Sequence, residues 1–161
     1  MAVTYLIIGS NLGDKVNYLK MANLYINQRI GLMLRKSAIY ESEPWGFNDE
    51  SSFLNQVIEL DTSLTPLELL KTIQSIETEL GRVRGKIQYS SRTIDIDILF
   101  YENLVFDSDT LKIPHPQIEF RKFVLVPLNE LSPEFMHPSL HLTIHQLLEK
   151  CLDSGYVRLV C

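Results

Sequence analysis

The chain has little cysteine and no long apolar run. Its two cysteines, Cys151 and Cys161, lie near the end of the sequence, so we expect neither a disulfide framework nor a cysteine-based zinc site in its body. No stretch reaches the roughly 18 uninterrupted apolar residues of a membrane span, and residues 1–9 show no basic leader and no cleavage site. We therefore expect a cytoplasmic protein with no membrane partner.

Positive charge is also scarce. Fifteen Lys and Arg stand against twenty Asp and Glu, and the net charge of −5 disfavours a protein that coats nucleic acid. The 161 residues are 45% hydrophobic and 22% charged, which suits one ordinary folded domain and excludes a disordered or collagen-like chain. Because the sequence shows no internal repeat or linker, we predict a single domain over residues 1–161 and favour a monomer.

Two nucleotide-binding signatures are absent. The sequence has no Gly-x-x-x-x-Gly-Lys-Ser/Thr, and Gly9-Ser-Asn-Leu-Gly13 lacks the spacing of a dinucleotide fingerprint. A P-loop enzyme and a Rossmann dehydrogenase are therefore both disfavoured. Gly9 and Gly13 are expected to serve a tight turn between a strand and a helix, where their amides could also approach a ligand.

Hydrophobic periodicity predicts an α+β protein. Helices are predicted over 15–30, capped by Asp14 and ended by Gly31, and over 66–80, opened by a Thr65–Glu68 capping box and ended by Gly81. Strands are predicted at 3–8, 32–40, 53–60 and 93–101. The order β-α-β-β-α-β closes most simply as a ferredoxin-like core, an antiparallel sheet with both helices on one face.

A C-terminal extension follows this core. Its expected parts are a hairpin within 103–112, a rigid turn at Pro114–Pro116, a short helix over 123–131, a further helix from Thr143 and a last strand near Leu159.

The segment between Leu80 and Ile94 has no acidic residue and four basic ones, Arg82, Arg84, Lys86 and Arg92. Arginine offers paired donors that match phosphate oxygens, so a phosphate site is one interpretation and a solvated basic loop is the other. The strand that follows alternates strictly, with Ile94, Ile96, Ile98 and Phe100 expected on one side and Asp95 and Asp97 on the other.

Two carboxylates on one strand face lie roughly 6.5–7 Å apart, close enough to share bound magnesium. The simpler interpretation is two aspartates on a solvent face. Together with the basic loop, the pair favours phosphoryl or nucleotidyl transfer, because cationic donors and metal ions neutralise phosphate charge.

Aromatic residues and histidines suggest further contacts. Phe53 and Asn55 share a strand face, and with Trp45 and Phe123 they could sandwich a heterocycle, although core packing explains aromatics equally well. His115, between two prolines, could donate to a phosphate. The histidines at 137, 141 and 145 are four residues apart, but Pro138 breaks any continuous helix, so we expect them on a polar surface rather than at a metal.

Ordered motifs then give the chain a family resemblance. They are Gly9-Ser-Asn-Leu-Gly13, Ser42-x-Pro44-x-Gly46, Phe53-Leu-Asn55, Glu77-x-x-x-Gly81-Arg82-x-Arg84, Arg92-Thr-Ile-Asp95-Ile-Asp97-Ile98, Pro114-His115, Arg121-x-Phe123 and Pro127-Leu128. The sequence resembles the 6-hydroxymethyl-7,8-dihydropterin pyrophosphokinase family of folate biosynthesis. The resemblance implies transfer of pyrophosphate from ATP to the reduced pterin, with release of AMP.

The resemblance also implies residue roles. Asp95 and Asp97 match ligands of two magnesium ions, and Arg82 and Arg92 match catalytic cations. The implied ATP contacts are Gln74, Glu77, Arg82, Arg84, Arg92, Ile98, Lys112, His115 and Arg121. The implied pterin contacts are Ser42, Pro44, Trp45, Phe53, Asn55 and Phe123.

Two other functions share this fold class. A metal-dependent nucleotidyltransferase would release pyrophosphate instead of AMP. An RNA-recognition module is disfavoured by the net charge of −5 and by Asp95 and Asp97 on the face where bases would stack.

Overall fold

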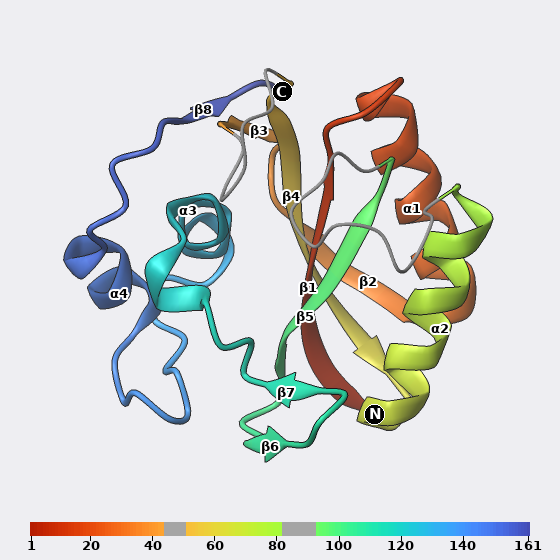
Figure 1. Cartoon of the computed structure of the whole chain (residues 1–161). Coiled ribbons are helices and arrows are strands. Elements are labelled where there is room, and N and C mark those ends of the chain that lie inside the picture. Colours follow the sequence, from red (N-terminus) through yellow and green to blue (C-terminus); the bar gives the residue numbers. More distant parts are fainter. Residues whose placement is uncertain (44–50, 82–92) are drawn as a thin grey trace.

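One antiparallel sheet organises the residues described by the computed structural model, 1–43, 51–81 and 93–161 (Figure 1). Within them, the order of strands in the sheet is β5 (Asp95–Tyr101), β1 (Ala2–Ser10), β4 (Phe53–Thr62), β3 (Tyr40–Ser42) and β8 (Val157–Leu159), while β2 (Gly31–Lys36) also pairs with β4. With helices α1 (Lys15–Arg29) and α2 (Pro66–Glu79), this confirms the predicted ferredoxin-like core. No helix in the described part of the chain is long and apolar enough to cross a membrane.

The predicted strand over 32–40 is divided into β2 and β3. Lys36 pairs with Ile58 and Tyr40 with Asn55, so a step of four residues (36 to 40) faces a step of three (58 to 55). Ser37 sits at the break, where its backbone N–H donates to the Val57 carbonyl at 2.8 Å and its Oγ accepts from the Val57 N–H at 3.0 Å. An extra residue of this kind is a β-bulge, which periodicity alone does not reveal.

Both long helices begin as predicted. The Asp14 side chain accepts from the Asn17 N–H at 3.2 Å, and Thr65 and Glu68 form the expected capping box. The prediction that Gly31 ends the first helix is wrong, because α1 is capped by Ile30 and Gly31 is the first residue of β2. A Cβ at Gly31 would lie 1.8 Å from the Asp61 carbonyl oxygen, so close approach of the neighbouring strand requires glycine there.

The sheet separates two hydrophobic clusters. The α1/α2-side core includes Leu6, Ile8, Ile58, Ile96 and Ile98. The α3/α4-side core includes Tyr5, Ile7, Val57, Leu99 and Phe100. In Figure 1, α1 and α2 cover one face as predicted, and the C-terminal extension covers part of the other.

The extension contains the predicted elements. They are β6 (Phe106–Asp107), β7 (Lys112–Ile113), α3 (Lys122–Leu131), α4 (Ile144–Lys150) and β8 as the last strand. The 3₁₀ turn η1 (Ile118–Phe120) was not predicted from the sequence. Thr143 and Gln146 form the expected capping box at α4.

Phe100 lies on the opposite face from the one predicted. Tyr5 pairs with Phe100 and Leu6 with Ile98, so a single step on β1 spans two on β5 and the alternation shifts at Leu99. The Phe100 ring consequently packs edge-on against Tyr5, with centroids 6.1 Å apart, in the α3/α4-side core. The alternation from Ile94 to Ile98 is unaffected, so Asp95 and Asp97 still face away from the α1/α2-side core.

His137 also departs from the prediction of a polar surface. Its side chain is 4% exposed, and its Nδ1 accepts from the backbone N–H groups of Ser139 and Leu140 at 3.1 Å each. The ring packs edge-on against Phe100 at a centroid distance of 5.5 Å. Local backbone donors satisfy this histidine, which lets it be buried, whereas His141 and His145 are exposed as predicted.

Candidate active site

Three neighbouring strands, β4, β1 and β5, bring two groups of predicted site residues onto one face. Gly9 on β1 pairs with Asn55 on one side and with Asp95 on the other. In the next row of the same face, Ile7 pairs with Val57 and Asp97. Because neighbouring strands lie about 4.8 Å apart, roughly 10 Å separates the Asn55 and Asp95 backbones across Gly9.

Gly9 lies on β1 between Asn55 and Asp95. A Cβ on Gly9 would stand 2.6 Å from Asn55 Oδ1, so the amide leans over the β1 backbone. The Asn55 Nδ2 donates to Ser42 Oγ at 3.1 Å, and both side chains are buried. The glycine is therefore needed inside the strand for close packing, whereas Gly13, with a φ of +74°, supplies the predicted turn. Sequence reasoning missed this role because it required the pairing partner of Gly9.

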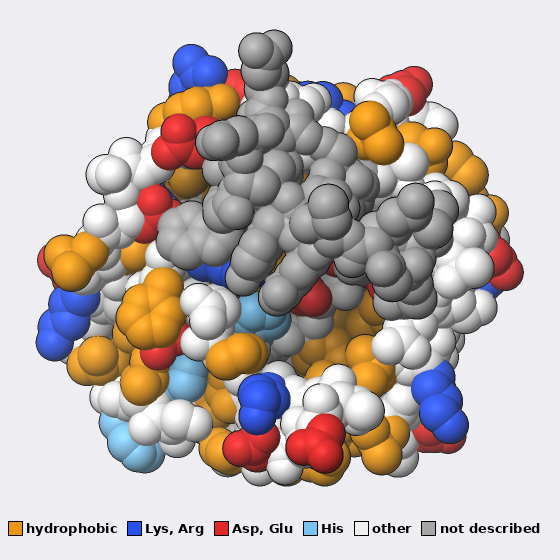
Figure 2. Space-filling view, in the orientation of Figure 1, with side chains coloured by type: hydrophobic (Ala, Val, Ile, Leu, Met, Phe, Trp, Pro, Cys, Tyr) orange, Lys and Arg blue, Asp and Glu red, His pale blue; other side chains and the backbone are white. Residues whose placement is uncertain are grey.

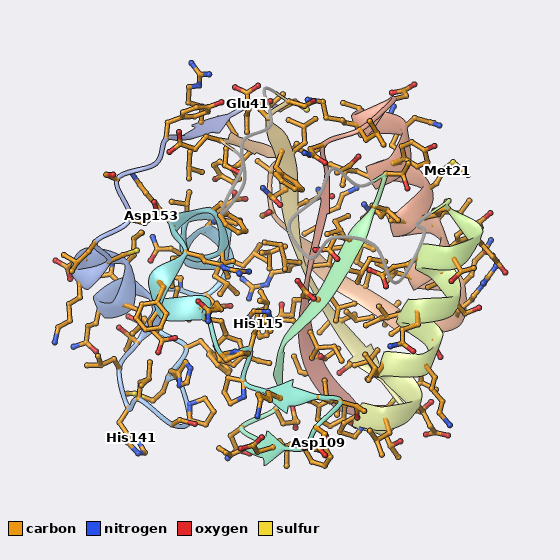
Figure 3. The ribbon with its side chains drawn as sticks, in the orientation of Figure 1. Met21, Glu41, Asp109, His115, His141 and Asp153 are labelled. Atoms are coloured by element: carbon orange, nitrogen blue, oxygen red, sulfur yellow. The ribbon has the colours of Figure 1, made fainter. Side chains whose placement is uncertain are left out.

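His115 approaches the aspartate pair from the extension. Its backbone N–H donates to the Leu99 carbonyl at 3.0 Å, and its Nδ1 accepts from the Gln117 N–H at 3.1 Å. Its Nε2 lies 4.0 Å from Asp97 Oδ2, and Figure 3 places the residue between α3 and β5. Burial, followed by the charge of Arg121, lowers the pKa of His115 to about 4 against the opposing influence of Asp95. The ring is therefore neutral near pH 7 and presents Nε2–H as a donor toward Asp97.

Glu77 supports the strand that carries both aspartates. It lies on α2 with 2% of its surface exposed, and its Oε2 accepts from the Ile96 N–H at 2.9 Å. Ile96 lies between Asp95 and Asp97 on β5, which is an edge of the sheet over the described residues. The buried carboxylate thus fixes the backbone between the two candidate metal ligands, and Gln74 lies exposed one turn earlier on α2.

The aspartate pair suits a hard divalent cation. Both carboxylates project to the same face from one strand, and the Asp97 side chain is 41% exposed. Magnesium takes one or two carboxylates and completes its coordination with water and phosphate oxygens. This donor set fits the predicted metal.

Other predicted ATP contacts are spread around this pair. The Ile98 side chain is 4% exposed in the α1/α2-side core, which leaves its backbone as the available contact. Lys112 forms an ion pair with Asp107 in the β6–β7 hairpin. Arg121 immediately precedes α3, and its Cζ lies 5.7 Å from the Phe123 ring centroid.

Within the described residues, the predicted pterin contacts come from three elements, β3, β4 and α3. Ser42 on β3 pairs directly with Phe53 on β4, and Asn55 follows on the same face of β4. Phe123 lies in the first turn of α3 and packs against the α3/α4-side core. In the space-filling view of this side, histidine and acidic side chains are exposed near the centre (Figure 2). The predictions for Pro44, Trp45, Arg82, Arg84 and Arg92 fall outside the described residues.

By its fold, then, the chain is an α+β protein of the ferredoxin-like class, with a polar candidate site on the α3 side of the sheet. A model of the 7,8-dihydro-6-hydroxymethylpterin-pyrophosphokinase (HPPK) family matches residues 5–133. The chain belongs to this family, which confirms the resemblance carried by its motifs.

Its relatives differ greatly in length. A 2-amino-4-hydroxy-6-hydroxymethyldihydropteridine pyrophosphokinase of Aquifex aeolicus is 41% identical over 86% of this chain and 85% of its own length. The folic acid synthesis protein fol1 of Schizosaccharomyces pombe is 40% identical over 95% of this chain, which spans only 21% of that longer protein. A crystal structure of Plasmodium falciparum HPPK-DHPS superposes with a TM-score of 0.77 over 92% of this chain and 44% of the other, at 18% identity. That last likeness concerns the fold alone.

Proposed function

We propose that the protein transfers the β,γ-pyrophosphoryl group of ATP to the hydroxymethyl group of 6-hydroxymethyl-7,8-dihydropterin and releases AMP, a step of folate biosynthesis. The observation that carries this proposal is the row formed by Asn55, Gly9 and Asp95 in a chain of the HPPK family. We assign the Asn55 end of this row to the planar ligand and call it the planar-ligand side, and we call the Asp95 end the phosphate side. The two ends lie roughly 10 Å apart on one face of the sheet. Similarity to the Aquifex pyrophosphokinase over most of both chains supports the same activity.

The planar-ligand side suits a pterin. Phe53 and Phe123 offer aromatic faces from two elements, and the Asn55 amide offers hydrogen bonds to a heterocycle edge. Its bond to Ser42 fixes the orientation of that amide before substrate arrives. The proposed pterin contacts are Ser42, Pro44, Trp45, Phe53, Asn55 and Phe123.

The phosphate side suits a metal-bound polyphosphate. Asp95 and Asp97 would hold two magnesium ions, which supply neutralisation of the phosphate charge. Arg82 and Arg92 are the proposed catalytic cations, and His115 would donate Nε2–H to a phosphate oxygen. The proposed ATP contacts are Gln74, Glu77, Arg82, Arg84, Arg92, Ile98, Lys112, His115 and Arg121.

The proposed reaction is an attack at the β-phosphorus, which is the attack that releases AMP. A pterin held beside Asn55 directs its hydroxymethyl oxygen along the row toward Asp95. That oxygen bonds to the β-phosphorus and loses its proton to solvent, while the bond from this phosphorus to the α,β-bridging oxygen breaks, so AMP departs with the bridging oxygen and the electron pair of the broken bond. Orientation of the two substrates supplies much of the rate gain in such reactions.

The remaining expectations concern partners and place. We propose ATP and the reduced pterin as the partners, and neither nucleic acid nor a membrane. We also propose a monomer in the cytoplasm.

Product analysis tests the function. Purified protein is incubated with ATP, magnesium and the dihydropterin alcohol, and nucleotides are separated by chromatography. We expect AMP only when the pterin is present. Release of pyrophosphate together with a nucleotidylated acceptor would instead identify a nucleotidyltransferase and refute the proposal.

A further inference from the structure

The C-terminal segment links β3 and α3, two of the three described elements that carry proposed pterin contacts. Ser42 lies on the three-residue strand β3, and Phe123 lies at the start of α3. Residues 153–159, here called the strap, run from beyond α4 to β8 beside β3 (Figure 1). The strap lies outside residues 5–133, which the family model matches.

At one end, the strap contacts the start of α3. Asp153 Oδ2 accepts from the Lys122 N–H at 3.1 Å, and Lys122 lies between Arg121 and Phe123. Arg121 provides no side-chain cap for this helix, so Asp153 supplies an acceptor for one of its first N–H groups. The other oxygen, Oδ1, accepts from the Gly155 N–H at 2.9 Å and fixes the following turn.

At the other end, the strap pairs with β3. Ser42 pairs with Val157, and Glu41 pairs with Arg158. The Arg158 guanidinium also donates to Glu41 Oε1 at 2.8 Å, while Glu41 Oε2 accepts from Ser52 Oγ at 3.0 Å. Because Ser52 immediately precedes β4, the Glu41 carboxylate joins the strap, β3 and the start of β4.

The Glu41 network lies on the opposite face of the sheet from the proposed pterin contacts. Tyr40 and Ser42 face α3, as shown by the Tyr40 hydroxyl, which donates to Glu130 on α3 at 2.7 Å. Glu41 alternates to the α1 side, where the Lys15 ammonium donates to the Ser52 carbonyl at 3.0 Å. Within the described residues, Arg158 is therefore connected to the proposed pterin contacts through β3 and the start of β4.

We propose that Asp153 and Arg158 are positioning residues that fix β3 and the start of α3 relative to one another and thereby raise the affinity for the pterin. The proposal rests on the function proposed above. Figure 3 labels Glu41 and Asp153, which mark the two ends of the link. The strap holds β3 and the start of α3 in place before the substrate binds, which reduces the entropy lost on binding.

The test compares Arg158→Ala with a matched variant, Arg29→Ala. Arg158 is 66% exposed, pairs with Glu41 and lies 4.3 Å from the Tyr156 ring centroid. Arg29 also pairs with a glutamate, Glu79, and lies 4.6 Å from the Tyr25 ring centroid, but no described contact links it to β3. Both variants are expected to fold, because neither removes core volume.

The dissociation constants of the dihydropterin alcohol and of a non-hydrolysable ATP analogue are measured by calorimetry in each variant. Loss of an ion pair at the surface changes a dissociation constant by at most about fivefold. We therefore expect Arg158→Ala to raise the dissociation constant of the pterin about threefold to fivefold. The ATP analogue should bind as it does to the wild type, and Arg29→Ala should change neither constant. Arg158→Lys should restore part of the pterin affinity, and Asp153→Ala should weaken pterin binding by a similar factor.

Two results would overturn the proposal while leaving the function intact. The first is a wild-type affinity for the pterin in Arg158→Ala. The second is an equal loss of affinity for the pterin and for the ATP analogue, which would indicate that the whole site, and not the planar-ligand side alone, is less ordered. Failure of the wild-type protein to bind the pterin at all would overturn the proposed function and this inference together.

Discussion

Replacing Gly9 by alanine tests the geometry that joins the two halves of the site. The new Cβ would lie 2.6 Å from Asn55 Oδ1, whereas ordinary van der Waals contact begins at 3.4 Å. The amide must therefore retreat by about 0.8 Å, the difference between those two distances. Ser42 lies on β3, on the other side of β4 from Gly9, so this retreat crowds the 3.1 Å hydrogen bond to Ser42 Oγ and forces either the amide to rotate out of it or β1 to move.

The cost follows from burial. Leaving a buried amide without its partner costs about 1–3 kcal/mol, and the reduced freedom of the unfolded alanine chain returns about 0.4–1 kcal/mol. We therefore expect a net loss of about 1–2 kcal/mol in the free energy of unfolding. For a protein of this length that corresponds to a fall of roughly 2–8 °C in Tm. The displaced amide should also weaken pterin binding by about tenfold.

Urea unfolding and pterin titration measure the two effects in the same preparation. The control is the same substitution in an Asn55→Ala background, where the clash is gone and Gly9→Ala should cost less stability by about 1 kcal/mol. Wild-type pterin affinity in Gly9→Ala would refute the reasoning, because it would mean that the Asn55 amide and the backbone beneath it do not shape the pterin side.

Substitutions at two further residues, His137 and Tyr5, and a pH series test other contacts. His137→Ala should destabilise the fold by about 1–3 kcal/mol because two backbone N–H groups lose their acceptor, whereas His137→Asn keeps an acceptor oxygen and should recover part of the loss in urea unfolding. Burial lowers the pKa of His137 from 6.5 despite the opposing charge of Glu119, with a smaller lowering from His141, so its contribution to stability is complete above pH 6.5 and declines as the pH falls through the lowered pKa. A Tm series from pH 8 to pH 5 should show this slope in the wild type and a shallower one in His137→Asn; equal slopes would contradict it. Tyr5→Phe should cost about 1–2 kcal/mol, since its hydroxyl bonds Glu59 at 2.8 Å and Ser132 at 2.7 Å, and an unchanged urea midpoint would show that these bonds add nothing.

Local patterns predicted much of this fold. The capping box at Thr65 and the alternation of Asp95 and Asp97 with buried isoleucines depend on neighbours within a few residues, and both are present. The bulge at Leu99 and the division at Ser37 depend on how a strand aligns with its partner. Those alignments are set by tertiary packing, so the face of Phe100 could not be obtained from periodicity.

In the candidate site, too, local features were predictable from the sequence and long-range contacts were not. Spacing along a strand predicted that Asp95 and Asp97 share a face and that Phe53 and Asn55 share one, and the family motifs supplied Ser42. That Asn55 and Asp95 lie on either side of Gly9 could be known only from the order of the strands in the sheet, because these residues are far apart in sequence. The packing of His137 against Phe100 and the contact of Asp153 with the Lys122 N–H each join segments that are far apart in sequence, so the sequence carries no local signal for them.

The turnover of purified Asp97→Asn tests the central claim most directly. The Asp97 side chain is 41% exposed and fills no core volume, so the variant should keep a Tm within a few degrees of the wild type, about 3 °C or less. If Asp97 holds metal against the phosphates of ATP, pterin-dependent AMP formation should fall by about a thousandfold or more at equal folded concentration. AMP formation within about tenfold of the wild type by that folded variant would contradict the account.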